Sequence, residues 1–129
     1  MSQYSQKPAS IKPSNNPGKA PYSILINTEN HTLTLYQGSQ VLRVYPVAVG
    51  KPTTPTPKGT FRIINKANNP GGPYGARWLG LSTPGIGIHG TNNPASIGNS
   101  VSHGCIRMNN KDVIELNQLV PIGSTVKII

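Results

Sequence analysis

The chain has 129 residues, with 14 glycines, 13 prolines and one cysteine, and 12 Lys and Arg against three Asp and Glu give a formal net charge of +9. This length suits one domain, and so many glycines and prolines disfavour a helical bundle and favour a β domain with many turns. The scarcity of acids argues against a mechanism built on paired carboxylates, and no apolar run reaches the ~18 residues of a membrane span.

The N-terminal segment, residues 1–20, is almost entirely polar and rich in Ser, Pro, Asn and Lys. This composition predicts a flexible tail or linker before a folded domain over residues 21–129. The segment has no apolar stretch of the kind found in a secretory signal peptide, so we expect no signal peptide in this chain.

Strands are predicted where short apolar or alternating runs stand between turn residues. They cover residues 22–27, 31–38, 40–50, 60–66, 77–81 and 85–90, with a hairpin loop at 28–30. Pro46 inside the third run indicates a sheet edge or a bulge, because proline lacks the backbone donor of a ladder bond. Residues 51–59, with three prolines, predict an extended surface loop, and residues 68–76 a glycine-rich loop.

A single helix is predicted after the cysteine. Asn109 or Asn110 would cap its N-terminus. Asp112 and Glu115 lie near that start, where acids interact favourably with the helix dipole. The predicted buried face consists of Val113, Leu116 and Val120. A last strand follows at 124–129, so the predicted fold class is mainly β with one helix.

The candidate chemistry is concentrated around Cys105. A lone cysteine is usually a small buried hydrophobe, but His103 lies two residues before it, and in extended backbone such residues share one face. The imidazole would then act as general base and make the thiol a nucleophile. Gly104 between them lets a substrate carbonyl approach, with the amides of Gly104 and Cys105 as donors to an oxyanion.

A second histidine, His89, is followed by Gly90 at the end of an apolar run. A histidine base has an orienting partner, and in a chain with so few acids we expect a backbone carbonyl in that role. Arg107 lies two residues after the cysteine, where its planar guanidinium would suit a substrate carboxylate. Tyr74 and Trp78 are candidates for a substrate groove, although core packing is the commoner role of a tryptophan.

Other interpretations of these residues stay open. His89, His103 and Cys105 are an acceptable set of zinc ligands, but their spacing matches no zinc signature and no glutamate base accompanies them. The basic residues are scattered, without a cluster or interleaved aromatics. This pattern argues against specific nucleic-acid binding and leaves weak attraction to polyanions. We expect no cofactor and no metal.

Two segments carry a resemblance to a known family. Residues 102–107 read Ser-His-Gly-Cys-Ile-Arg and are preceded by Ile-His-Gly-Thr at 88–91. Residues 54–61 read Thr-Pro-Thr-Pro-Lys-Gly-Thr-Phe, a less specific segment when taken alone. Together they resemble the signature of the L,D-transpeptidase catalytic domain, the YkuD family, and the resemblance covers residues 22–129.

The resemblance implies a β-sandwich-like fold and an enzyme that forms 3→3 cross-links in peptidoglycan. The residue matching Cys105 attacks the amide after the third residue of a tetrapeptide stem, expels D-alanine and holds the rest as a thioester, which the amine of another stem resolves. His103 serves as general base and acid, with Gly104 and the Cys105 amide as the oxyanion hole. The predicted substrate-binding residues are His89, Gly90, Ser102, Arg107, Tyr74 and Trp78.

Two alternatives to this function remain. They are an L,D-carboxypeptidase, with water in place of the acceptor amine, and a non-catalytic basic module that binds the cell wall. We expect a monomer that acts on stem peptides in the wall or spore envelope of a bacterium, with a role in cell shape and weak attraction to anionic wall polymers. The resemblance also implies that a carbapenem acylates Cys105.

Overall fold

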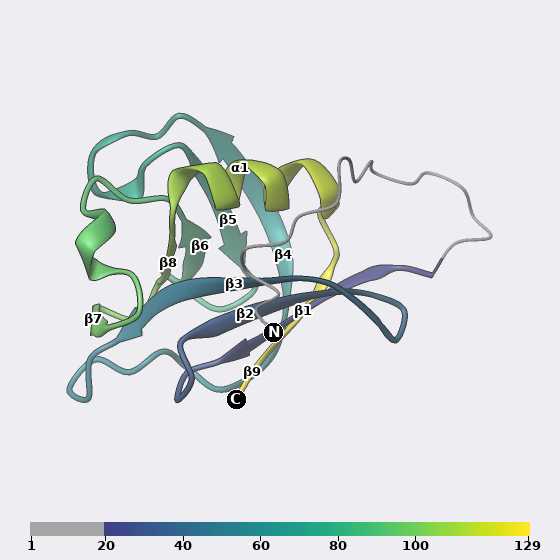
Figure 1. The fold of residues 1–129 in the computed structure, drawn as a ribbon, viewed down its shortest axis with the longest axis horizontal. Coiled ribbons are helices and arrows are strands. Elements are labelled where there is room, and N and C mark those ends of the chain that lie inside the picture. The colour runs from purple at the N-terminus through teal and green to yellow at the C-terminus, as the bar shows by residue number, and fades with distance from the viewer. Residues whose placement is uncertain (1–19) are drawn as a thin grey trace.

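The computed structural model describes residues 20–129. The predicted tail therefore lies outside the described residues, apart from Ala20. The described chain forms nine strands, one α-helix and two short 3-10 helices (Figure 1). The strands are β1 (Tyr22–Asn27), β2 (Thr32–Gln37), β3 (Gln40–Gly50), β4 (Gly59–Asn68), β5 (Arg77–Leu81), β6 (Gly87–His89), β7 (Ser100–Ser102), β8 (Ile106–Met108) and β9 (Thr125–Ile128). The helices are η1 (Gly72–Tyr74), η2 (Pro94–Ser96) and α1 (Asn110–Leu119).

Two long strands join two halves of one sheet. β3 pairs with β2 over its first part and with β8 and β7 over its last residues. β4 pairs with β9 at its start and with β5 from Ile63 onward. Because β3 and β4 each belong to both halves, β1, β2 and β9 enclose one core together with β5, β6 and β8. The predicted mainly β, sandwich-like fold with one helix is confirmed.

Pro46 lies where β3 changes its partner. It is the last β3 residue paired with β2, and the next residue, Val47, donates its amide to the carbonyl of His31. Proline has no backbone N–H to donate, and here this missing donor lies at the end of the β2–β3 ladder. The bulge in the β2–β3 ladder lies elsewhere, between Leu35 and Tyr36 of β2.

The core is built from alternate strand residues, as the sequence pattern predicted. The inward strand residues, each at most 2% exposed, are Ile24, Ile26, Leu33, Leu35, Tyr45, Val47, Val49, Ile63, Leu79, Leu81, Ile88, Ile106, Met108, Val126 and Ile128. α1 adds Val113, Leu116 and Leu119 and packs against β5 and β6. Within residues 20–129, no helix combines the length and apolar character needed to cross a membrane.

The C-terminus of α1 is capped by a residue from the sheet. Lys66 of β4 donates through Nζ to the carbonyls of Asn117 and Val120, at 2.9 and 2.5 Å. A cation at this position satisfies carbonyls that have no partner within the helix and opposes the negative end of its dipole. Burial lowers the pKa of Lys66.

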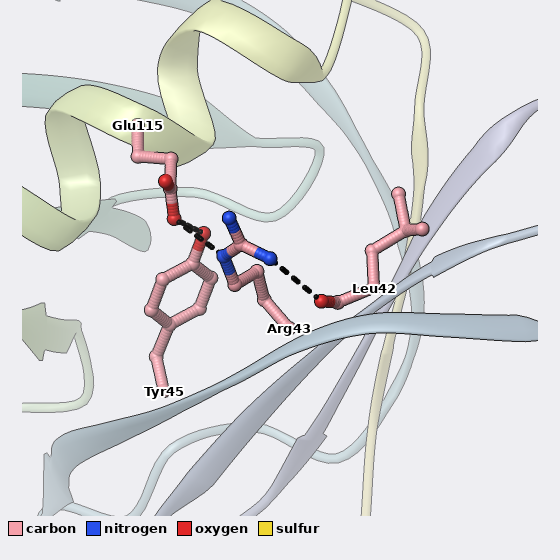
Figure 2. A network of polar contacts seen from close by, with 4 residues as sticks. All are labelled: Leu42, Arg43, Tyr45 and Glu115. Atoms are coloured by element: carbon pink, nitrogen blue, oxygen red, sulfur yellow. Dashed lines mark hydrogen bonds and ion pairs between the residues drawn. The ribbon is translucent and has the colours of Figure 1, made fainter. Parts of the chain in front are cut away.

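A buried polar network ties α1 to β3 (Figure 2). Asp112 lies in the first turn of α1, as predicted, whereas Glu115 lies further along the helix and faces the sheet. Oε1 of Glu115 accepts hydrogen bonds from Nε of Arg43 at 3.1 Å and from the hydroxyl of Tyr45 at 2.6 Å. Glu115 therefore serves the attachment of the helix rather than its dipole. Burial, followed by the bond to Glu115, raises the pKa of Tyr45.

Candidate active site

Most of the predicted site residues line one pocket. This hollow of about 310 Å³ is lined by Pro73, Tyr74, His89, Ser102, His103, Cys105 and Arg107. β6 and β8 run parallel with His89 paired to Arg107, and β7 ends at the residue before His103. Neighbouring strands and the turn between β7 and β8 therefore bring together groups that are far apart in the sequence.

The backbone between His103 and Cys105 is not extended. β7 ends before His103, Gly104 has a φ of +122°, and β8 begins after Cys105. The alternation that predicted a shared face is therefore wrong here, although a tight turn still places both side chains in the pocket. A Cβ at Gly104 would lie 3.0 Å from Cδ1 of Ile86 in a conformation that L side chains rarely adopt, so the turn requires glycine.

The hydroxyl of Ser102 holds this turn closed. It donates to the carbonyl of Cys105 at 2.6 Å and accepts the amide of Gly104 at 3.1 Å. Ser102 is 2% exposed, so its hydroxyl braces the turn from beneath the pocket. The amides of Gly104 and Cys105 were the two predicted oxyanion donors. The Gly104 amide donates to the Ser102 hydroxyl, whereas the Cys105 amide does not bond to that hydroxyl.

The proline-rich loop at 51–58 packs against the same turn. Oγ1 of Thr54 donates to the carbonyl of Ser102 at 2.8 Å, and the amide of Lys51 donates to the same oxygen at 3.1 Å. Thr56 is buried. The sequence predicted only an extended surface loop, whereas its first half fixes the backbone that carries the cysteine. The repeated Thr-Pro pairs were the signal that this loop has a defined shape.

Burial and two neighbouring groups shift the pKa of Cys105. Its thiol donates to the carbonyl of Gly85 at 3.5 Å. Burial raises the pKa of Cys105, and the backbone amide of Gly87 and the charge of Arg107 lower it by less, so the net direction is upward. This direction favours the protonated thiol, so a base that takes its proton would assist attack on a substrate.

His89 has the properties of such a base. Its Nδ1 lies 2.5 Å from the carbonyl of Gly90, which can only accept, so Nδ1 carries the hydrogen and Nε2 keeps its lone pair. Burial lowers the pKa of His89, which keeps the ring neutral. The ring stacks on Trp78 with centroids 5.7 Å apart and meets the edge of Tyr74 at 5.1 Å. These contacts fix the orientation of the imidazole.

His103 has a different environment. Its side chain is exposed and makes no hydrogen bond within the part of the chain that the structure describes. The backbone carbonyl that we expected beside the histidine base is found on His89 instead.

The remaining predicted residues lie around the pocket. Arg107 lines it, and no carboxylate among residues 20–129 pairs with its guanidinium. Trp78 lies outside it, between hollows of about 430 and 290 Å³, and donates through Nε1 to Asn65 at 3.1 Å. Trp78 therefore supports the ring of His89 and belongs neither to the core nor to this pocket. Gly90 contributes its carbonyl, which accepts the hydrogen bond from Nδ1 of His89.

Asn110 is a site residue whose function the sequence did not predict. As the first residue of α1, it accepts the amides of Ala76 and Thr91 at Oδ1, at 3.0 and 3.1 Å. Its Nδ2 donates to the carbonyl of Thr91 at 3.0 Å. Any Cβ at Gly75 or Gly90 would collide with this amide. Asn110 thus joins the segment after Tyr74 to the segment after His89, where a helix cap was expected.

The described chain offers no group of three His, Cys, Asp or Glu side chains that could hold a metal ion.

Comparison with known proteins gives consistent matches. A family model described as the L,D-transpeptidase catalytic domain, YkuD, matches residues 21–128. The YkuD protein of Bacillus subtilis, which carries an L,D-transpeptidase name, is 58% identical over 112 residues, or 87% of this chain and 68% of that protein.

Solved structures match the fold over most of the chain. The catalytic domain of an Enterococcus faecium L,D-transpeptidase is 29% identical with a TM-score of 0.73, and the match covers 84% of this chain and 96% of that one. An L,D-transpeptidase from Mycobacterium smegmatis is 25% identical with a TM-score of 0.75, over 85% of this chain. The match covers 59% of the mycobacterial chain, so this chain spans less than two thirds of it.

Proposed function

Because the chain belongs to the YkuD family of L,D-transpeptidase catalytic domains, we propose that it is a peptidoglycan L,D-transpeptidase with Cys105 as its nucleophile. The observation that carries this proposal is the pocket of about 310 Å³ in which Cys105 meets two histidines and an arginine. A thiol, a neutral imidazole and an unpaired guanidinium at one pocket are suited to acyl transfer from a substrate that carries a carboxylate.

In the acylation step, Sγ of Cys105 attacks the carbonyl carbon of the third residue of a tetrapeptide stem, in the amide that joins this residue to D-alanine. A histidine takes the thiol proton, and the Cys105 amide donates to the oxyanion that forms. The carbon–nitrogen bond then breaks, the histidine returns the proton to the departing amine, and D-alanine leaves. The product is a thioester between the tripeptide stem and Cys105.

In the second step, the side-chain amine of the third residue of another stem attacks the thioester. The carbon–sulfur bond breaks, the histidine accepts the amine proton and passes it to the thiolate, and a 3→3 cross-link is released. If water attacks instead, the same intermediate gives a tripeptide and the enzyme is an L,D-carboxypeptidase. The acceptor alone distinguishes the two reactions.

We assign the proton transfers to His89 in preference to His103. The resemblance predicted His103, but His89 is the buried, neutral and oriented ring, with its Nδ1 held by the carbonyl of Gly90. Its role requires the Cys105 thiol to rotate away from the carbonyl of Gly85. Hydrogen bonds of this kind are often absent before the substrate binds.

The test is incubation with a disaccharide-tetrapeptide, followed by mass spectrometry of the products. We expect a cross-linked dimer that has lost one D-alanine. A tripeptide product would replace the transpeptidase by a carboxypeptidase, and unchanged substrate would favour a non-catalytic wall-binding module. Cys105→Ala is the matched control and should release no D-alanine. A carbapenem should add its mass to the wild type and not to Cys105→Ala.

A further inference from the structure

The strands β2, β1, β9 and the start of β4 are neighbours in one half of the sheet (Figure 1). Two hollows lie over these strands, and together they are called the furrow. One hollow of about 520 Å³ is lined by Ser23, Arg62 and Thr125 among others, and a second of about 350 Å³ by Tyr36 and Lys127. Ser23 and Thr125 line both hollows, so the two hollows adjoin each other. None of the residues around the catalytic pocket lines either hollow.

The strand register places two cations side by side in this furrow. Lys127 of β9 is paired with Thr60 of β4, and Arg62 is paired with Thr125. These outward residues alternate with buried ones, so Arg62 and Lys127 are diagonal neighbours on one face, about 7–8 Å apart. Both side chains are exposed, and so is Lys58, one residue before β4 begins.

No Asp or Glu side chain forms an ion pair with these cations in the described part of the chain. The three acidic residues of the chain are Glu29, in the turn after β1, and Asp112 and Glu115, both on α1. Arg62 uses one guanidinium nitrogen to donate to the carbonyl of Gly123 at 2.8 Å and keeps its other donors for a ligand. The furrow therefore combines two cations that no Asp or Glu side chain among residues 20–129 pairs with and the hydroxyls of Ser23 and Thr125.

We propose that this furrow binds an anionic polymer with phosphodiester groups, such as a polyol-phosphate chain of a bacterial wall. The four strands under the furrow span ~14 Å at the usual strand spacing, a length that suits a linear chain rather than a single ion. Tyr36 is the one aromatic ring that lines the second hollow, which gives little platform for stacked nucleobases. Binding here would hold the protein on the wall while the catalytic pocket stays accessible.

The test is binding of a poly(glycerol phosphate) fragment, measured by calorimetry at low salt on the full chain carrying Cys105→Ala. This background separates the result from the proposed reaction, because no turnover is needed. Lys127→Gln and Arg62→Gln together should weaken binding by about 5- to 20-fold, as expected for two exposed ion pairs. Lys111→Gln, an exposed cation on α1, is the matched control and should change the affinity less than twofold. Affinity should fall as salt rises.

Three outcomes would overturn the proposal. They are no binding at low salt, an equal loss from Lys111→Gln, which would mean attraction to net charge alone, and tighter binding of a single-stranded oligonucleotide with the same number of phosphates. Because Arg62 also holds a turn, Lys127→Gln alone must show a measurable part of the loss. Hydrolysis or transfer on a soluble tetrapeptide by the Lys127→Gln variant with intact Cys105 should match the wild type.

Discussion

At Cys105, burial and charge act on the thiol in opposite directions. Burial raises the pKa of Cys105, and the Arg107 guanidinium partly offsets this by favouring the thiolate. The rate of alkylation by iodoacetamide should therefore keep rising with pH beyond the ordinary range of a thiol, because the thiolate is the reactive form. Arg107→Gln removes the offsetting charge, so the inflection should move to higher pH and the rate near pH 7 should fall. An inflection that moved to lower pH would contradict this account, and Lys111→Gln should leave it in place.

Arg107 also has a predicted role in binding the donor. Because its guanidinium lines the pocket without a carboxylate partner, Arg107→Gln should lower kcat/KM on a tetrapeptide donor by about 10- to 150-fold, the value of one charge-assisted bond. Arg107→Lys should recover part of the loss, since it keeps the charge without the planar fork. The measurement includes a donor whose carboxylate is replaced by a carboxamide. Equal losses on both donors would show that the arginine does not bind that carboxylate.

The two histidines predict opposite results in a paired experiment. His89→Gln should lower kcat/KM by about 10²- to 10⁴-fold, the usual contribution of a general base, and His103→Gln by less than about tenfold. Both variants are measured on a tetrapeptide donor, with the pH profile of kcat/KM recorded for each. The acidic limb, which reports protonation of the base, should disappear in His89→Gln only. A larger loss in His103→Gln would restore the assignment that the resemblance implied.

Much of this pocket was predictable from residue types and spacing. The histidine, glycine and cysteine sequence pointed to Cys105, and alternation predicted Arg107 on the same face; both residues line the pocket, although Cys105 itself lies before β8 begins. The neighbouring prediction for His103 rested on the same alternation and lost its basis, because the positive φ of Gly104 turns the backbone. The choice between His89 and His103 depends on burial and on one carbonyl, which are properties of the folded chain.

A single amide side chain joins the start of α1 to the segments that follow Tyr74 and His89. Asn110→Ala removes three hydrogen bonds that join the segments following Tyr74 and His89. We expect a loss of about 2–4 kcal/mol in the free energy of unfolding, since two backbone amides lose their partner. The rise in KM should exceed the fall in kcat, because the pocket wall moves while the thiol stays in place.

Asn109→Ala is the matched control for this experiment. Asn109 caps α1 without a side-chain hydrogen bond, so its replacement should cost well under about 1 kcal/mol and leave KM unchanged. Urea unfolding and steady-state kinetics measure both variants. Equal effects of the two substitutions would contradict the bracing role of Asn110.

Among the elements, those with a clear period and the apolar run that contains β6 were predicted, whereas β7 and β8 were not. The alternation in residues 22–27 and 31–38 gave β1 and β2 to within one residue, and the apolar face of α1 gave its inward side. β7 and β8 have three residues each, too few for a period to emerge. They form because β3 and β6 offer edges to pair with, and that information is distant in the sequence.

At the scale of the whole molecule, the sequence did not predict that the long strands β3 and β4 connect the two halves of the sheet. Each run was predicted as a strand, but pairing with both halves of the sheet depends on contacts between distant segments. α1 is then held to β3 by Glu115 and to β4 by Lys66. In the described part of the chain, the only α-helix is thus attached to the sheet through one of the three acidic residues and through the buried Arg43.

This attachment yields a prediction for global stability. Arg43 is 3% exposed and Glu115 is 27% exposed, so Glu115→Ala leaves a buried guanidinium without its carboxylate. Breaking a buried pair from one side costs about 3–5 kcal/mol, and here the Tyr45 hydroxyl also loses an acceptor. Glu115→Gln keeps an acceptor oxygen for one of the two donors and should cost less.

Thermal unfolding measures these variants beside Glu29→Ala, an exposed acid in the β1–β2 turn that should leave the Tm unchanged. Arg43→Met combined with Glu115→Leu should recover much of the loss, because apolar side chains of similar size remove the stranded charge. The catalytic pocket contains none of these residues, so the folded Glu115→Ala protein should keep its kcat/KM at 25 °C. A Glu115→Ala protein as stable as Glu29→Ala would mean that water replaces the carboxylate, and that the core alone attaches α1.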